Sequence, residues 1–297
     1  MIADELSYQI CRQFDFTPTA QQRQAIRTFV SFMADRDAHT AMILRGSAGT
    51  GKTSIAAAIV KSLASLGQKM LLLAPTGRAA KVFSINSNHE AFTIHCRIYR
   101  ERSYSGIGGT FNLNDNMHTD TLFIIDECSM ISNGTGGESA FGSGRLLDDL
   151  IQYIYSGRNC RMLLIGDRAQ LPPVGEQESP ALNSRVIAAY GLKLYEQDLN
   201  EVLRQSQDSG ILYNATTIRT MITHDAHTLL PKIRLHGFAD ISIVTGNELI
   251  ESLASSYSKV GTDETMVITR SNKRSNIYNR GIRNMVLGRE EELTAGD

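Results

Sequence analysis

The sequence predicts an α/β protein in which a parallel sheet is flanked by helices. Four largely apolar runs of strand length support this prediction, at residues 41–44, 69–74, 121–125 and 161–165. Strands that are apolar on both faces are typical of parallel sheets, because helices cover both faces of such sheets. Segments with the length and one-sided apolar spacing of helices lie between these runs.

The overall composition is that of an ordinary globular protein. At 297 residues the chain has room for two domains, although one large domain also fits. The formal net charge of −1 produces no global positive field that would attract nucleic acid. A local basic groove stays compatible with that sum, because attraction depends on how the charges are distributed.

The cysteines and the apolar runs indicate a reducing compartment without membrane contact. Cys11, Cys96, Cys128 and Cys160 lie far apart and form no C-x-x-C pair, so neither a zinc site nor a disulfide framework is expected. The start of the sequence is acidic, and no apolar run is long enough to span a bilayer. We therefore expect a cytoplasmic protein.

Two helices are expected before the first strand. Residues 3–14 place apolar side chains on one helical face. A second helix is expected to begin after Thr19, whose hydroxyl is a good N-cap, with Pro18 just outside.

A glycine-rich loop lies between the first apolar run and a helix-forming stretch at residues 54–63. The loop fits the pattern G-x-x-x-x-G-K-[ST] at every fixed position, with Gly46, Ser47, Ala48, Gly49, Thr50, Gly51, Lys52 and Thr53. Its glycines allow backbone N–H groups to surround phosphate oxygens at a helix N-terminus. Lys52 is expected to reach the β- and γ-phosphates, and the Thr53 hydroxyl to ligate Mg²⁺. The loop therefore predicts binding of a nucleoside triphosphate such as ATP.

Gln22 has two interpretations. Its side-chain amide both donates and accepts hydrogen bonds, so it suits the edge of an adenine base. A solvated helix glutamine fits the same position equally well.

The second strand is expected to end in Pro75-Thr76-Gly77-Arg78, where a further helix begins. Loops at the carboxyl ends of parallel strands are where such sheets bind ligands. Thr76 and Arg78 therefore either contact a phosphodiester backbone or only cap the helix. Thr93 and His95 bring a hydroxyl and an imidazole to the same edge.

Residues 99–119 are polar, contain several glycines and carry scattered aromatic side chains, which suits a small hairpin that projects from the domain. Aromatic residues on such a hairpin either stack on bases or form its own minimal core.

The third strand delivers two adjacent carboxylates, Asp126 and Glu127, to its carboxyl end. Asp126 is expected to hold the hydration shell of Mg²⁺. Glu127 is expected to orient and deprotonate an attacking water. A second acid at this position indicates hydrolysis rather than binding alone.

The fourth strand leads into Asp167 and Gln170, followed by Pro172 and Pro173. Polar side chains at this strand end are placed to sense the γ-phosphate. The two prolines stiffen the loop, so that a shift there is transmitted rather than absorbed.

Six segments follow one another in a specific order: Thr19 with Gln22, Gly46–Thr53, Ala74–Ala80, Thr93–His95, Ile125–Met130 and Gly166–Val174. This set resembles motifs Q, I, Ia, Ic, II and III of superfamily 1 DNA helicases, in particular their RecD-like and Dda-like branch (similar to the exodeoxyribonuclease V alpha subunit). Leu199–Gln205 resembles motif IV of the same family.

The resemblance implies a RecA-like P-loop NTPase and an ATP-dependent DNA helicase that tracks single strands from 5′ to 3′. It implies that Arg204 reaches the γ-phosphate, that Gln22 reads adenine and that Gln170 couples the nucleotide state to the strand. Single-stranded DNA, or duplex with a single-stranded tail, would contact Pro75, Thr76, Arg78, Thr93 and His95. Relatives of this type also work with nuclease or repair-complex subunits.

The resemblance further implies a motor domain at residues 1–190, with an excursion like domain 1B at 99–119, and a partial second RecA-like domain at 191–297. Within the second part, strands are expected at 241–244 and 266–269, and helices at 246–258 and 272–286. Motifs V and VI of the family do not occur before Asp297. A nucleotide-gated DNA-binding or regulatory subunit with little turnover is therefore the alternative.

Overall fold

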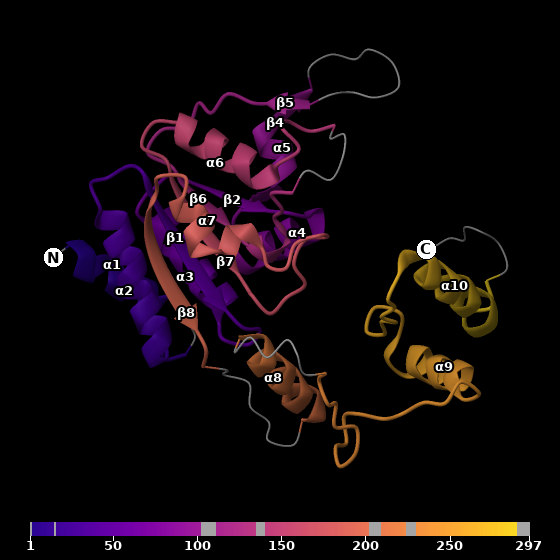
Figure 1. Cartoon of the computed structure of the whole chain (residues 1–297). Coiled ribbons are helices and arrows are strands. Elements are labelled where there is room, and N and C mark those ends of the chain that lie inside the picture. The colour runs from indigo at the N-terminus through magenta and orange to yellow at the C-terminus, as the bar shows by residue number, and fades with distance from the viewer. Residues whose placement is uncertain are drawn as a thin grey trace. The chain divides into compact units, whose positions relative to one another are not determined.

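The computed structural model describes residues 2–14, 16–101, 111–134, 140–201, 209–223 and 230–289 (Figure 1). Contacts divide the chain into two compact units. The first comprises residues 1–205 and 219–229, and the second comprises residues 206–218 and 230–297. Each unit is described by itself below.

The first unit is built on a six-stranded sheet with the order β3-β2-β6-β7-β1-β8. Every neighbouring pair in this sheet runs parallel. The strands are β1 (Thr40–Gly46), β2 (Met70–Ala74), β3 (Ala91–Thr93), β6 (Leu122–Ile125), β7 (Arg161–Gly166) and β8 (Lys193–Leu199). The predicted α/β class with a parallel sheet flanked by helices is therefore confirmed.

Alternate residues of the central strands face two separate cores, because successive side chains of a strand point to opposite faces. On one face, Met42 and Ile124 pack with side chains of the helices α1 (Ile2–Arg12), α2 (Ala20–Ala34) and α3 (Lys52–Ser65). On the other face, Ile43 and Phe123 pack with side chains of α5 (Ile94–Ile98), α6 (Leu146–Ser156) and α7 (Ser184–Ala188). Helix α4 (Gly77–Ser87) adds Phe83 to the first core. Both faces of the sheet are thus covered, as parallel strands require.

Helix α2 begins where the sequence predicts. The Thr19 hydroxyl accepts a hydrogen bond from the Gln22 backbone N–H, and the Gln22 side chain accepts one from the Thr19 backbone N–H. This reciprocal capping box satisfies two N–H groups that a helix start otherwise leaves without partners.

A two-stranded antiparallel hairpin, β4 (Tyr99–Glu101) with β5 (Phe111–Leu113), follows α5. It lies beside α5 and α6 in Figure 1. Phe111 stacks on Phe141 with ring centroids 4.6 Å apart, and the Tyr99 hydroxyl donates to buried Asp149 at 2.7 Å. Aromatic residues of the predicted excursion therefore serve as its core; residues 102–110 lie outside the described part of the chain.

Strand β8 lies after residue 190, in the part of the chain that was predicted to form the second domain. It pairs with β1 along seven residues and belongs to the first unit. Arg45 of β1 explains why so polar a strand pairs there. Its guanidinium contacts the carboxylates of Glu196 at 2.5 Å and Asp198 at 2.6 Å.

Among the described residues of the second unit, the regular secondary structure is helical. It contains α8 (Gly210–Thr223) up to Ile218, α9 (Leu249–Val260), α10 (Asn272–Gly281) and a π-helical turn at Ile282–Val286. The helices predicted at 246–258 and 272–286 are therefore present.

The strands predicted at 241–244 and 266–269 are wrong, since both segments have no strand assignment. Neither segment has a neighbouring strand among the described residues of this unit, so its backbone N–H and C=O groups form no ladder. Across all described residues, no helix has the length and apolar character needed to cross a membrane.

Candidate nucleotide-binding site

The sheet order brings three strand ends together. Strand β7 lies between β6 and β1, with Leu164 opposite both Ile125 and Ile43, and Gly166 opposite Arg45. The glycine-rich loop therefore follows β1 at the same edge where Asp126 follows β6 and Asp167 follows β7. This edge holds the carboxyl ends of the strands, which is where open α/β sheets bind ligands.

The glycines of the loop have the backbone geometry that the motif requires. Gly49 and Gly51 have φ values of 79° and 87°, a left-handed region that other residues rarely adopt. A Cβ atom on Gly46 would lie 2.7 Å from Thr50 Oγ1 and 2.9 Å from Leu199 Cβ, so only glycine fits there. Helix α3 begins directly after the loop at Lys52, which aims the helix N-terminus at the loop.

Lys52 folds back onto its own loop. Its ammonium donates to the Gly46 carbonyl at 2.7 Å and to the Ser47 carbonyl at 3.0 Å. Burial lowers the pKa of Lys52, while Asp167, Glu127 and Asp126 act on it in the opposite direction. These carboxylates favour the charged form of Lys52 and so partly offset the effect of burial.

One cavity of about 600 Å³ brings together three of the predicted catalytic groups, Lys52, Glu127 and Gln170. Lys52 and Thr53 line it from the loop side, Asp126 and Glu127 from the end of β6, and Gln170 from the loop after β7. The remaining lining residues are Phe16, Ser47, Ala48, Gly49, Gly51 and Ser54. Residues from four separate parts of the chain therefore meet around a space with room for a triphosphate.

The two carboxylates have distinct environments. Asp126 accepts a hydrogen bond from the Glu127 backbone N–H at 2.9 Å, and burial raises the pKa of Asp126 to about 6. Glu127 has φ 54°, a strained conformation that for a non-glycine residue is frequent at functional sites. The Thr53 hydroxyl and the Asp126 carboxylate both line the cavity and are the hard oxygen ligands that Mg²⁺ prefers. These residues fit a magnesium ion.

Gln170 is joined to the loop that carries the two acids. The Ser129 hydroxyl donates to Gln170 Oε1 at 2.5 Å. The turn that presents Gln170 is closed by its backbone N–H, which donates to the Asp167 carbonyl at 3.2 Å, and by the Ala169 N–H on the Asp167 carboxylate at 2.9 Å. Sequence reasoning did not single out Ser129, although it lies two residues after Glu127 in the same motif.

Gln22 does not line this cavity. Its side chain is 1% exposed, its Nε2 donates to the Thr50 carbonyl at 3.1 Å, and its Oε1 accepts from Thr19. The amide therefore connects the start of α2 to the phosphate loop. Recognition of an adenine edge by Gln22 stays a prediction. The sequence signal was present, because Thr19-x-x-Gln22 is a capping-box pattern.

One arginine was predicted for this site, and the structure shows another beside Asp167. Arg204, the predicted γ-phosphate arginine, lies at 202–208, outside the described residues. Arg219, which no motif indicated, belongs to the first unit and lies 3.8 Å from Asp167. It also acts electrostatically on Lys52, so it adds positive charge beside the phosphate loop.

The predicted DNA contacts lie at a neighbouring part of the same sheet edge. Strands β2 and β3 end side by side, with Ala74 opposite Thr93. The Thr76 hydroxyl accepts from the Ala79 N–H and the Thr93 hydroxyl from the Cys96 N–H, so both threonines cap helices. Pro75 is half-buried and Arg78 is exposed.

The His95 ring packs near other aromatic rings. Its ring lies 5.6 Å from that of Tyr99 and 5.1 Å from that of Phe141, and burial lowers its pKa. It therefore packs in the aromatic cluster beneath the hairpin. A DNA contact by any of these residues stays a prediction.

A family model described as an AAA domain, AAA_30, matches residues 17–230. The ATP-dependent RecD2 DNA helicase of Deinococcus radiodurans is 33% identical over 136 residues, which cover 46% of this chain and 16% of that protein. The ATP-dependent DNA helicase dda of Enterobacteria phage T4 is 28% identical over 204 residues, covering 68% of this chain and 42% of that protein. The chain thus spans less than half the length of either relative.

Among solved structures, a Bacteroides Pif1 helicase in complex with ADP-AlF3 and single-stranded DNA has a TM-score of 0.41 and 18% identity, covering 87% of this chain and 62% of that one. The family match covers the glycine-rich loop, both acids and Gln170. The sequence matches confirm the resemblance to RecD-like and Dda-like helicases that the motifs indicate. The chain belongs to the AAA domain family AAA_30.

Proposed function

We propose that this chain is the motor portion of a cytoplasmic ATP-dependent DNA helicase, which binds and hydrolyses ATP with Mg²⁺ and moves along single-stranded DNA from 5′ to 3′. One observation carries the proposal. A single cavity collects Lys52, Thr53, Asp126, Glu127 and Gln170. The names of the sequence relatives, both ATP-dependent DNA helicases, support the same activity.

Lys52 changes its hydrogen-bond partners when the nucleotide binds. The ammonium that now donates to the Gly46 and Ser47 carbonyls turns to the β- and γ-phosphate oxygens, where it neutralises charge that develops during bond cleavage. The loop N–H groups and the α3 N-terminus hold the remaining phosphate oxygens. Thr53 and Asp126 would hold Mg²⁺, which would neutralise phosphate charge.

Glu127 then acts on water. Its carboxylate lines the cavity together with Lys52, so it can orient a water for in-line attack on the γ-phosphate and accept its proton. Its left-handed backbone conformation turns the residue away from the strand direction of β6. The strain is consistent with a residue whose position serves chemistry rather than stability.

The link to DNA runs through Gln170. The Ser129–Gln170 hydrogen bond joins the loop of the two acids to the loop after β7, so a change at the γ-phosphate displaces both. Single-stranded DNA is proposed to bind at the neighbouring edge formed by Pro75, Thr76 and Thr93. Nuclease or repair-complex subunits are the further partners that the RecD-like resemblance supports.

The test is steady-state ATP hydrolysis by the chain with and without oligo-dT. We expect stimulation by oligo-dT that weakens as salt rises, because phosphate contacts release counterions. Glu127→Gln is expected to lower the rate by on the order of 100-fold or more, as loss of a general base does. Glu264→Gln, an exposed glutamate of the second unit, is the matched control and is expected to leave the rate unchanged.

Other outcomes decide against the motor. Tight ATP binding without turnover, with or without oligo-dT, would support the alternative of a nucleotide-gated DNA-binding or regulatory subunit. Absence of both Mg²⁺-dependent ATP-analogue binding and salt-sensitive oligo-dT binding would contradict the proposal altogether.

A further inference from the structure

Helix α4 carries an apolar pair on its exposed face. Its opposite face is buried through Ala80, Phe83 and Ser87, and Phe83 belongs to the first core. Val82 is 50% exposed and Ile85 is 69% exposed. The two residues lie three positions apart, so they are neighbours on the helix surface. Among the described residues of the first unit, no other helix carries two exposed large apolar side chains.

Two cations of the same helix border this pair. Arg78 lies four positions before Val82, and Lys81 lies four positions before Ile85, so each cation is one turn away from an apolar neighbour. Both cations are exposed. Arg78 lies in the first turn of α4, where the helix dipole disfavours a positive charge. Helix stability therefore does not explain an arginine at this position.

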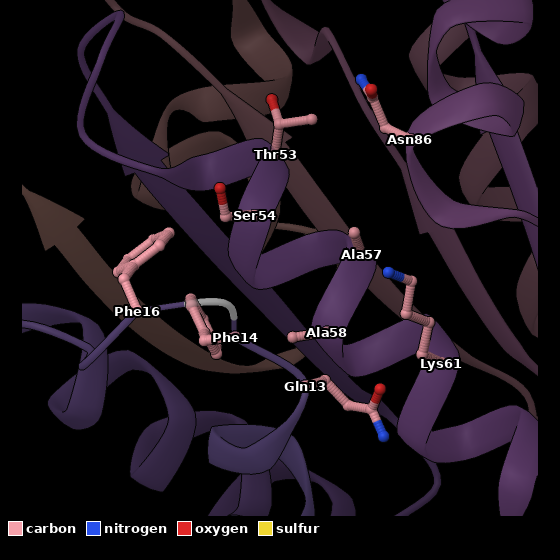
Figure 2. A pocket seen from close by; sticks show the side chains of 9 residues that line it. All are labelled: Gln13, Phe14, Phe16, Thr53, Ser54, Ala57, Ala58, Lys61 and Asn86. Atoms are coloured by element: carbon pink, nitrogen blue, oxygen red, sulfur yellow. The ribbon is translucent and has the colours of Figure 1, made fainter.

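A third cation comes from the neighbouring helix. Helices α3 and α4 pack against each other, and Lys61 of α3 and Asn86 of α4 line one cavity of about 180 Å³. Figure 2 shows both side chains at this cavity. Asn86 lies four positions after Val82, so Lys61 lies on the α3 side of the apolar pair.

The positive charge of this region has no local acidic partner. Neither α3 nor α4 contains an aspartate or a glutamate, and the next acid, Glu90, lies beyond the end of α4. Within the described part of the chain, no carboxylate forms an ion pair with Lys61, Arg78 or Lys81. Charge complementarity therefore favours an acidic partner.

The apolar pair decides between two kinds of acidic partner. A nucleic-acid backbone satisfies the cations but offers nothing apolar to cover Val82 and Ile85. Bases stack on aromatic rings, and the aromatic residue of α4, Phe83, is buried. An acidic protein segment with apolar side chains at helical spacing satisfies the cations and covers both aliphatic side chains.

We propose that the α4 surface, which consists of Lys61, Arg78, Lys81, Val82 and Ile85, docks an acidic amphipathic segment of another protein. None of these five residues lines the cavity around Lys52, so the inference does not depend on the proposed ATP hydrolysis. A surface of this size is typical of a transient interaction.

The probe is a fluorescein-labelled peptide of about 18 residues, or five helical turns, with leucine at every third or fourth position and glutamate and alanine between. A matched peptide has glutamine in place of each glutamate. Each peptide is titrated with the full chain, and binding is followed by fluorescence anisotropy. The acidic peptide is expected to bind at least about 10-fold more tightly than the glutamine peptide, with a difference that shrinks as salt rises.

Two double variants separate the apolar and charged parts of the surface. Val82→Gln with Ile85→Gln keeps good helix formers and is expected to weaken binding of the acidic peptide by on the order of 10-fold, because the apolar contact is lost. Arg78→Gln with Lys81→Gln is expected to weaken binding and to flatten its salt dependence. All four side chains are exposed, so both variants are expected to keep the wild-type circular dichroism spectrum.

Matched controls lie on other elements. Met117→Gln replaces an apolar side chain that is 87% exposed, and Arg36→Gln replaces an exposed cation after α2. Both are expected to leave the affinity for the acidic peptide unchanged.

Four results would overturn the inference. The first is no binding of the acidic peptide to the wild-type chain, or equal binding to the variant that lacks Val82 and Ile85. The second is equal affinity for the acidic and glutamine peptides. The third is oligo-dT binding that weakens in this variant as much as peptide binding does, which would assign the surface to nucleic acid. The fourth is dimerisation of the wild-type chain that this variant loses, which would assign the surface to a second copy.

Discussion

Similar apolar sequence patterns form different structures in the two units of the chain. In the first unit, apolar runs become strands, and the α3 helix buries seven residues against the sheet. In the second unit, helices α9 and α10 contain no buried residue among those described. The apolar segments 241–244 and 266–269 there have no strand assignment.

Individual side chains show the size of this difference. Ile124 of β6 is 0% exposed, whereas Ile268 is 88% exposed. The two residues have the same intrinsic preference for extended backbone, so the difference comes from their neighbours. Ile124 has parallel strands on both sides and helices on both faces. A run of apolar residues therefore becomes a strand only where other strands supply hydrogen-bond partners.

The largest expected effect tests this comparison with one substitution at two positions. Ile124→Ala is expected to lower the free energy of unfolding of the first unit by about 2–5 kcal/mol, because it leaves a cavity in a packed core. Ile268→Ala is expected to change the free energy of unfolding of the second unit by less than about 0.5 kcal/mol, as for other exposed positions. Urea unfolding followed by circular dichroism measures both. Equal effects would mean that the second unit has a core of its own.

A smaller effect is expected from a buried hydrogen bond. Tyr99→Phe removes the hydroxyl that donates to Asp149, a carboxylate that is 3% exposed. The loss is expected to cost about 1–3 kcal/mol, because the buried acceptor loses a donor without regaining water. Tyr213→Phe, at a half-exposed position of the second unit, is the matched variant and is expected to be neutral. A neutral Tyr99→Phe would show that water replaces the lost donor.

The smallest effect concerns helix caps. Thr19→Ala removes the cap of α2, a helix that contains six buried residues, and is expected to cost about 0.5–2 kcal/mol of global stability. Ser271→Ala removes the equivalent cap of α10, where no described residue of the helix is buried. That variant is expected to speed amide hydrogen exchange within α10 only. Global destabilisation by Ser271→Ala would show that α10 belongs to a cooperatively folded core.

Much of the first unit could be predicted from sequence because local and global preferences agree there. The runs that became β1, β2, β6 and β7 are apolar on both faces, which only a covered parallel sheet accommodates. Strand β8 was not predicted as part of this sheet. Its Glu196 and Asp198 obscure the strand pattern, and their partner Arg45 lies far away in the sequence.

The candidate site also has features that the sequence predicts and features that it does not. The loop and the acids Asp126 and Glu127 are contiguous motifs, so the sequence alone predicts their chemistry. The Ser129–Gln170 hydrogen bond and the Gln22–Thr50 contact join residues that are distant in sequence, and no spacing rule predicts such pairs. For Gln22, the side chain contacts Thr19 and Thr50, and recognition of adenine stays a prediction.

The proposed function depends most directly on whether the cavity around Lys52 binds a nucleotide. Isothermal titration of the chain with Mg·ATPγS, compared with the Lys52→Ala variant, measures this. We expect one binding site per wild-type chain, with an affinity at least about 10-fold lower in Lys52→Ala, because a buried charge pair with phosphate is lost. Absence of binding to the wild-type chain, or equal affinity in both proteins, would contradict the account.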